Sequence, residues 1–204
     1  MDAATDWVVD GGRYALDFDG SNDHVLTGVL TASGQMSFSF WFFRRNTSTH
    51  RFLANRNDAQ GTGTGFDIYT VSTNSLNIFN GSNFATSNNA FSNNAWNHAV
   101  ISCKSTSGVD FFVNGRLSAS VSGNATIAQS SFGVFFGRLS QSSESHFSGL
   151  MDDIIIWNRI IPSAEANQLY QIGRGGMLTP RQRRRAYFAG VSGLRRRLLL
   201  TGQV

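Results

Sequence analysis

The sequence predicts an all-β fold in which two antiparallel sheets form a sandwich, followed by one short helix and an arginine-rich tail. Between Arg13 and Trp157, short apolar or alternating runs are separated by clusters of Gly, Asn and Ser, a spacing typical of sandwiches and barrels. The 204 residues include 17 Phe and 21 Gly but only 2 Pro, which allows a large core and glycine-based turns. A convincing helical pattern appears only after Pro162.

The first clear strand is the run 36–43. Its residues alternate, with Phe38, Phe40 and Phe42 on one side, so this side is predicted to face the core. The run 96–103 alternates in the same way. Further β-type runs cover 132–138 and 147–157.

A hairpin is predicted around the pair Asn114-Gly115. This pair lies between an alternating run, 109–113, and a second one that contains Leu117, Ala119 and Val121. Asn-Gly favours a type I′ turn because both of its central residues need a positive φ. We therefore expect the two runs to pair as antiparallel neighbours.

One helix follows the strands and sets the domain boundaries. Pro162 suits a first helical turn, Leu169 and Ile172 share one side, and Gly173 is a typical stop. After it comes the flexible sequence Arg-Gly-Gly. We expect an N-terminal arm at 1–12, the sandwich at 13–173, and a basic and apolar tail at 174–204.

The charge of the chain is unevenly distributed. Residues 1–173 carry nine basic and 13 acidic side chains, whereas the tail carries eight arginines and no acidic residue. The high pI therefore belongs to the tail, and it does not make the body a nucleic-acid-binding domain. The single cysteine, Cys103, excludes an intramolecular disulfide and a cysteine-based zinc site. We expect no export signal and no membrane span, because neither the start nor any 18-residue stretch is suitably apolar.

Five fragments occur in an order that resembles the laminin-G-like family of concanavalin-A-like lectins and glucanases. They are 15–23 (ALDFDGSND), 38–42 (FSFWF), 96–98 (WNH), 112–115 (FVNG) and 147–157 (FSGLMDDIIIW). The resemblance covers roughly residues 13–172 and implies a jelly roll with two antiparallel sheets of about six or seven strands. Many members bind calcium, glycans or protein partners. The fold alone establishes none of these.

A calcium site is one expectation that the resemblance supports. The loop at 19–23 concentrates oxygen ligands, and a distant acidic pair adds carboxylates, which suits a hard cation. The expected ligands are Asp19, Asn22, Asp23 and Asp153. The alternative is that the loop is only a turn, and that Asp152 or Asp153 ends a strand or pairs with an arginine.

An enzyme is not expected. A glycoside hydrolase on this fold needs two carboxyl groups about 5 to 10 Å apart. Glu144 and Glu165 are the only glutamates, and the adjacent Asp152 and Asp153 are expected on opposite faces of a strand. His98 is interpreted as a core or sheet-face residue rather than a base, and no Gly-x-Ser-x-Gly motif occurs.

Glycan binding is instead expected in polar loops that also contain an aromatic residue or an arginine. Hydroxyl-rich ligands are recognised by amide, hydroxyl and aromatic groups around an apolar patch. The loops are 56–58, 80–84 and 142–146, with Arg56, Asn57, Asp58, Asn83 and Phe84 as candidate ligand-binding residues. Asn and Ser are also ordinary turn residues, so a purely structural role stays open.

The tail is interpreted as an anchor that becomes ordered on a partner. Its arginines could neutralise phosphates, but the apolar residues beside them favour docking on an acidic protein surface over nucleic acid. The partner-binding candidates are Arg181, Arg183, Arg184, Arg185, Arg195, Arg196, Arg197, Leu198, Leu199 and Leu200.

A lectin-like module without a recognisable export signal fits a particle that is assembled inside a cell and released by lysis. The combination also resembles, more loosely, virion proteins of tailed phages. We therefore expect a non-enzymatic virion-surface protein, a capsid decoration or fibre component that is oligomeric in the assembly and possesses a lectin-like module. The alternative is a cellular carbohydrate-binding or adhesion module.

Overall fold

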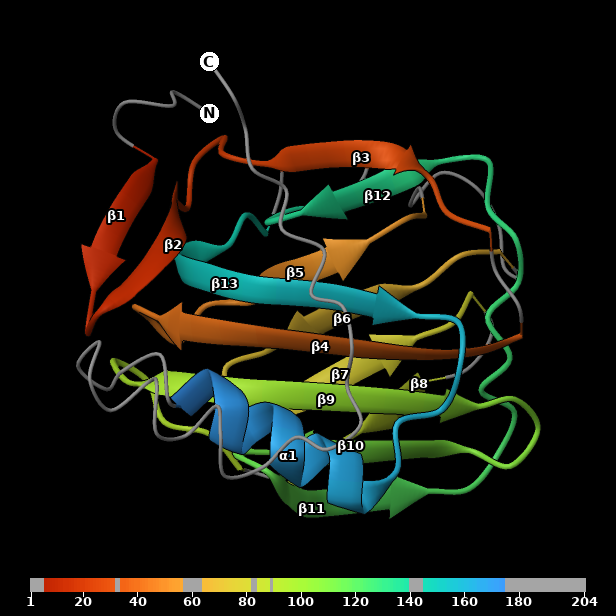
Figure 1. The fold of residues 1–204 in the computed structure, drawn as a ribbon. Coiled ribbons are helices and arrows are strands. Elements are labelled where there is room, and N and C mark those ends of the chain that lie inside the picture. Colours follow the sequence, from red (N-terminus) through yellow and green to blue (C-terminus); the bar gives the residue numbers. More distant parts are fainter. Residues whose placement is uncertain are drawn as a thin grey trace.

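The computed structural model describes residues 6–31, 34–56, 64–81, 84–88, 90–139 and 145–174. These residues form two antiparallel sheets and one helix, which confirms the predicted all-β sandwich. Figure 1 shows one sheet in front of the other, with the helix on the outer face of the front sheet.

The front sheet has seven strands in the order β1-β2-β13-β4-β9-β10-β11. Their bounds are β1 Trp7–Asp10, β2 Arg13–Asp19, β4 Gln35–Arg44, β9 Trp96–Lys104, β10 Val109–Val113, β11 Arg116–Val121 and β13 Ser148–Trp157. Strand β1 pairs with β2 from Trp7 onward. The sandwich therefore begins earlier than residue 13, the start that was predicted from the sequence. The expected arm therefore includes an edge strand.

The rear sheet has six strands in the order β3-β12-β5-β6-β7-β8. Their bounds are β3 Val25–Val29, β5 His50–Ala54, β6 Asp67–Thr70, β7 Leu76–Phe79, β8 Phe84–Thr86 and β12 Gly133–Phe136. All pairings between neighbours in both sheets are antiparallel.

The core lies between the two sheets. Phe38, Phe40 and Phe42 are fully buried in it, as their alternation predicted. Side chains from the rear sheet pack against them, among them Phe52, which lies 5.2 Å from Phe40 and 4.9 Å from Phe42 between ring centroids. Burial of this many phenylalanines is the main stabilising contribution to the fold.

The predicted hairpin is present between β10 and β11. Asn114 has a φ of 50° and Gly115 a φ of 77°, as a type I′ turn requires. Val113 and Arg116 are register partners on either side of it.

Helix α1, Ser163–Arg174, covers part of the outer face of the seven-stranded sheet (Figure 1). Ala166 and Leu169 pack with Val100, Phe112 and Trp157 in a second, smaller apolar cluster. Across the described residues, no helix is long and apolar enough to span a membrane. The helix covers part of the outer face of the seven-stranded sheet, and no helix of the described residues lies on the outer face of the six-stranded sheet.

Candidate functional site

The outer face of the six-stranded sheet carries a band of polar and aromatic residues. Arg51 on β5, Tyr69 on β6, Asn77 on β7 and Thr86 on β8 are successive register partners. Their neighbours along the strands, such as Ile68 and Ile78, point into the core. Because side chains alternate along a strand, these four residues share the outer face.

A second row runs beside the first on the same face. It joins Phe135 on β12, Ala54 on β5, Asp67 on β6 and Phe79 on β7 through consecutive pairings. Phe79 and Phe135 lie outside the main core cluster although only 7% and 9% of their surfaces are exposed. Other side chains on the outer face must therefore cover them.

Three arginines cover the aromatic rings of this face. The guanidinium carbons lie 4.5 Å from the Tyr69 ring centroid for Arg51, 4.3 Å from that of Phe79 for Arg56, and 5.0 Å from that of Phe135 for Arg138. Each distance is within the range of a cation–π contact. We call the set Arg51, Arg56, Asp67, Tyr69, Asn77, Phe79 and Thr86 the rear platform.

Hydrogen bonds and an ion pair fix the rear platform. Nε of Arg51 lies 3.0 Å from Oδ2 of Asp67, which is almost fully buried. The Thr86 hydroxyl donates to Oδ1 of Asn77 at 2.7 Å. Burial, and then the charge of Asp67, raise the pKa of Tyr69, so its hydroxyl stays protonated and able to donate. The platform thus carries a phenol hydroxyl, guanidinium groups and a threonine hydroxyl on one face of the sheet.

The residues expected to bind a ligand converge only in part. Arg56 covers Phe79, and Phe84 is the register partner of Phe79, so one residue from each of two predicted loops lies next to Phe79. Asn57, Asp58 and Asn83 lie outside the described residues. The sequence analysis missed Arg51, Asp67 and Tyr69. The alternation in 67–70 places Asp67 and Tyr69 on the same side of a strand, and this pattern could have identified them as neighbours on one face.

The expected calcium ligands are not brought together. Asp19 pairs in register with Ser148, so Asp153 lies roughly 15 Å farther along β13. The Asp19 carboxylate accepts hydrogen bonds from the Ser21 and Asn22 amides, and the Asp23 carboxylate accepts one from the Asp19 amide. The hydrogen bond from the Ser21 backbone amide is the main cause of the lowered pKa of Asp19. These residues form a turn, and the described residues contain no group of three His, Cys, Asp or Glu arranged for a metal.

Asp152 and Asp153 do not point to opposite faces, so that expectation was wrong. Nη2 of Arg13 lies 2.6 Å from Oδ2 of Asp152 and 3.2 Å from Oδ2 of Asp153. The reason is a register shift in β13 after Asp152, where Asp153 has a φ of 47° and leaves the regular alternation. The alternative that these acids pair with an arginine is therefore the observed one.

His98 is a buried sheet-face residue, as interpreted from the sequence. Its Nε2 lies 3.0 Å from the Ser39 hydroxyl, and its ring contacts those of Trp41 and Tyr170. Burial, with a contribution from the Arg13 charge, lowers its pKa to about 3. The ring is therefore neutral at physiological pH.

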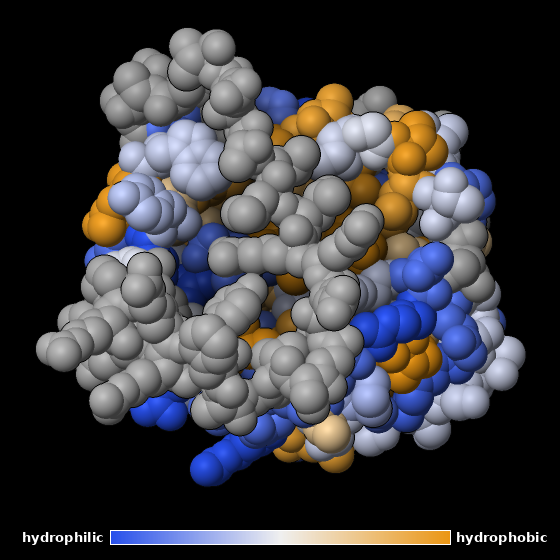
Figure 2. Space-filling model, viewed as in Figure 1, coloured by the Kyte–Doolittle hydropathy of each residue, from blue (hydrophilic) through white to orange (hydrophobic). Residues whose placement is uncertain are grey.

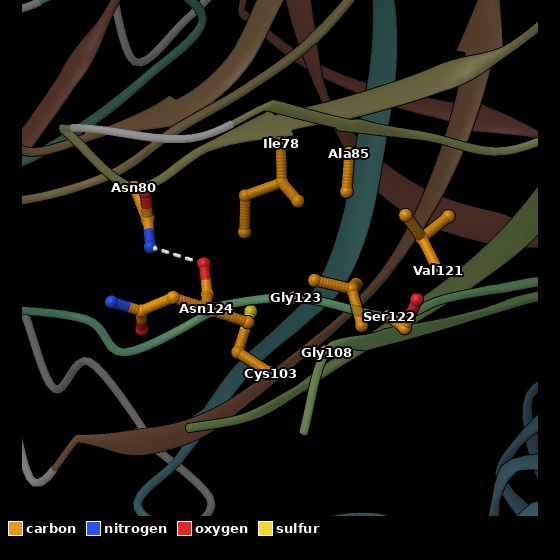
Figure 3. Close-up of a pocket in the computed structure, with 11 residues that line it drawn as sticks. Ile78, Asn80, Ala85, Cys103, Gly108, Val121, Ser122, Gly123 and Asn124 are labelled. Atoms are coloured by element: carbon orange, nitrogen blue, oxygen red, sulfur yellow. Dashed lines mark hydrogen bonds between the residues drawn. The ribbon is translucent and has the colours of Figure 1, made fainter. Parts of the chain in front are cut away.

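A small pocket opens between the sheets, away from the rear platform (Figure 3). Figure 3 shows Cys103, Ile78 and Val121 around it, with Asn80 donating to the Asn124 carbonyl oxygen at 3.1 Å. Its volume is about 100 Å³. Small-molecule sites begin near 300 Å³, so this pocket is too small for a sugar ring. Burial raises the pKa of Cys103 to about 12, which keeps its thiol unreactive.

Apolar residues are also exposed at the edge hairpin of the front sheet. Trp7, Val9 and Tyr14 on β1 and β2 are 57%, 64% and 71% exposed. On the visible side of the molecule, hydrophobic and hydrophilic residues are intermingled (Figure 2). The one arginine of this hairpin, Arg13, is buried, and its two strands contain no amide side chain. The predicted tail contacts, at 181–185 and 195–200, lie outside the described residues.

The comparisons with known proteins agree with the fold. A family model described as the concanavalin A-like lectin/glucanases superfamily matches residues 19–167. The chain belongs to this superfamily. No curated protein sequence matches the chain.

Solved structures with the superfamily fold are distant in sequence. A heptameric SAP-like pentraxin from Limulus polyphemus is 16% identical with a TM-score of 0.63, over 81% of this chain and 85% of that one. The CBM40 of a Ruminococcus gnavus sialidase, bound to α2,3 sialyllactose, is 12% identical with a TM-score of 0.57, over 73% and 97%. Domain 4 of a Geobacillus stearothermophilus arabinanase, in complex with arabinotriose, is 16% identical with a TM-score of 0.59, over 81% and 80%. At these identities the likeness shows the fold.

Proposed function

We propose that this chain is a non-catalytic carbohydrate-binding module that binds glycans on the rear platform. The observation that carries the proposal is the pairing of Arg51 with Tyr69 and of Arg56 with Phe79 on a sheet face that α1 does not cover. Sugar rings have apolar faces and polar rims, so they suit an aromatic surface with nearby hydrogen-bonding groups.

The chemistry of the platform fits this role step by step. The half-buried Tyr69 ring holds the Arg51 guanidinium in place over it, and its hydroxyl supplies a donor. Arg51 and the exposed Thr86 lie on either side of it in the same row and can bond to sugar hydroxyls. Asp67 and Asn77 are buried beneath this layer and hold it in place.

The state of the acidic residues supports a non-catalytic role. Hydrolysis of a glycosidic bond requires one carboxyl group as an acid and another as a base or nucleophile. Among the described residues, Asp152 and Asp153 pair with Arg13, Glu165 pairs with Arg159, and Asp67 pairs with Arg51. The carboxylate on the rear platform is thus fixed by an arginine.

The relatives give further support for a sugar ligand. Two of the structures above contain bound oligosaccharides, arabinotriose in one and α2,3 sialyllactose in the other. One is domain 4 of an arabinanase, and the other is the CBM40 of a sialidase. An equivalent role for this chain would be to hold a partner on a glycan surface.

A glycan microarray tests the proposal directly. We expect the full chain to bind a subset of glycans, and Tyr69→Ala to lose at least tenfold in affinity because it removes the phenol hydroxyl and the ring over which the Arg51 guanidinium lies. Tyr14→Ala is the matched control, since Tyr14 is exposed on the other sheet. Absence of binding to any glycan, or equal loss in both variants, would refute the proposal.

The virion location, with a capsid or neighbouring subunit as partner of the tail, stays a prediction. It is compatible with a glycan-binding body, because a virion-surface protein with such a module would contact host glycans. The alternative of a cellular adhesion module uses the same platform. The two differ in the partner of the tail, for which a prediction is given below.

A further inference from the structure

We propose that the edge hairpin is the docking site for the C-terminal tail of a second copy of this chain. The docking surface is the row of apolar side chains on β1 and β2, and its occupant is the segment 181–200, which combines arginines with apolar residues. The proposal concerns assembly and is independent of the glycan site on the rear platform. It is based on the alternation of the hairpin, on its free edge and on its charge.

The apolar row continues the core-facing side of β2 beyond the rear sheet. Phe18 is fully buried in the core, and Leu16, on the same side of β2, packs partly against it. Tyr14 is the next residue on that side and is 71% exposed. The register partners of Leu16 and Tyr14 on β1 are Trp7 and Val9, which therefore share this side. Figure 1 shows the hairpin to the side of the rear strands, so the described part of the chain places no second sheet over the row.

Strand β1 is also an edge strand, because it comes at the end of the strand order of its sheet. Three of its four residues are apolar, and only the last, Asp10, is charged. Trp7 and Val9 are 57% and 64% exposed. Charged residues, Pro and bulges usually protect such an edge from pairing with another chain. An exposed apolar edge strand instead suits an extended segment of a partner, which can pair with the edge and cover the apolar face.

The charge around the hairpin selects a basic occupant. The two strands and the described residues that form ion pairs with them comprise five aspartates and two arginines, a formal net charge of −3. They are Asp10, Asp17, Asp19, Asp152, Asp153, Arg13 and Arg45. A contact between the hairpins of two copies would bring these like charges together, which is unfavourable. An apolar segment that also carries positive charge satisfies both properties of the surface.

The tail has this composition. Residues 181–200 include seven arginines and no acidic residue, and no other stretch of 20 residues in the chain contains as many arginines. Apolar pairs and triplets adjoin the arginine clusters, at 187–188 and 198–200. Because β1 is an edge, one segment can contact the apolar row on one side of it and Asp10 on the other. Arginines can pair with the carboxylates in two hydrogen bonds while the leucines pack against Trp7 and Val9.

The geometry favours the tail of a second copy over the tail of the same chain. Helix α1 ends beside Arg13, whose Nη1 donates to the carbonyl oxygen of Gly173 at 2.8 Å. Side chains alternate along β2, so Arg13 lies on the opposite side from Tyr14. A tail that starts there has to turn round the edge of its own hairpin, whereas the tail of a neighbour reaches the apolar row directly. Each copy then offers one tail and one hairpin, and the contact continues head to tail into a ring or a chain of copies.

Sedimentation velocity of the full chain tests the surface. The wild type is expected to self-associate with rising concentration. Trp7→Thr combined with Val9→Thr keeps residues that suit a strand but removes the apolar row, so self-association is expected to weaken at least about tenfold. Val9→Lys, a single change at an exposed position, is expected to act in the same direction because it also repels the arginines. The control is Leu117→Thr, since Leu117 is 56% exposed on the opposite edge strand of the same sheet, β11, and this variant is expected to associate like the wild type. Melting temperatures show that each variant is folded.

A mixing experiment tests the pairing of tail and hairpin. The tail variant has an intact hairpin and keeps every arginine, but its apolar tail residues are replaced with Ser at Tyr187, Phe188, Leu198, Leu199 and Leu200. The Trp7→Thr, Val9→Thr variant has an intact tail. Each variant alone is expected to be monomeric. Their mixture is expected to form a complex of two chains and nothing larger, because it contains one functional hairpin and one functional tail per pair.

Three results would overturn the proposal. A wild type that stays monomeric at every concentration would refute docking on a second copy. Self-association of the tail variant equal to that of the wild type would show that another surface mediates the contact and would refute the tail as the occupant. An equal loss in Leu117→Thr and in the hairpin variants would refute the position of the surface. Raising NaCl from about 50 to 500 mM is expected to weaken the association without abolishing it, since the apolar contacts are not screened.

Discussion

Arg13 joins the start of the front sheet to the end of helix α1 through one hydrogen bond. Its Nη1 donates to the carbonyl oxygen of Gly173, 160 residues away, at 2.8 Å. The same buried guanidinium lies over Trp41 at 4.4 Å and pairs with Asp152 and Asp153. This arginine therefore fixes the position of the helix end from which the tail continues.

Removal of Arg13 is predicted to destabilise the sandwich strongly. Arg13→Ala leaves two neighbouring carboxylates without their cation and removes the bond to Gly173, so we expect a loss of about 3 kcal/mol in the free energy of unfolding. Urea denaturation measures this loss. The control is Arg45→Ala, because Arg45 pairs with Asp17 on the surface and is expected to cost about 1 kcal/mol or less. Equal losses in the two variants would contradict the role of Arg13.

Gly173 is predicted to tolerate no side chain. A Cβ at this position would overlap the indole of Trp41, so Gly173→Ala must displace the end of α1. We expect a lower melting temperature and altered tryptophan fluorescence, since Trp41 stacks on Tyr170 of the same helix at 5.6 Å. Ala164→Ser, at an exposed helix position, is expected to leave both unchanged. An unaltered melting temperature in Gly173→Ala would show that the helix is not packed as described.

His98 is predicted to make stability depend on pH. Burial lowers its folded pKa to about 3 from about 6.5, so the fold favours the neutral ring. The resulting stability is fully present above pH 6.5 and is lost as the pH falls towards 3, by up to about 1.4 kcal/mol per pH unit. Urea titrations between pH 6.5 and 4.5 are expected to show a steeper loss for the wild type than for His98→Asn. Identical slopes would mean that His98 titrates normally in the fold.

The tail is predicted to mediate assembly rather than stability. A chain ending after Arg174 retains every described contact of the sandwich, so its melting temperature and glycan binding are expected to be unchanged. In the full chain, replacing Leu198, Leu199 and Leu200 with Ser is expected to impair incorporation into particles, measured by co-sedimentation. If that variant is incorporated normally and the tail binds duplex DNA with a strong salt dependence, nucleic acid is the partner instead.

Local patterns in the sequence predicted the fold well. The alternation around Phe40, the Asn114-Gly115 turn and the helix after Pro162 depend on residues close in the chain, and all three appear in the structure. The five ordered fragments identified the same family that the family model matches. These signals succeed because strand period, turn chemistry and helix termini are set within a few residues.

The candidate site could be predicted only in part, because it depends on register between distant strands. Arg56 was predicted from its loop, but its position over Phe79 follows from the pairing of β5, β6 and β7. Asp153 was assigned to the Asp19 loop because the family resemblance implied that the two meet. A local positive φ and the distant Arg13 decide its actual position. Neither can be read from the neighbouring residues.

The most direct test of the account is amide chemical-shift mapping of the labelled full chain during titration with the best glycan from the microarray. We predict that the largest changes occur in β5, β6 and β7, at residues such as Arg51, Tyr69 and Asn77, with few changes in α1. Changes centred on Trp7 and Tyr14 at the edge hairpin, or on residues around the Cys103 pocket, would contradict the assignment of the rear platform as the glycan-binding site.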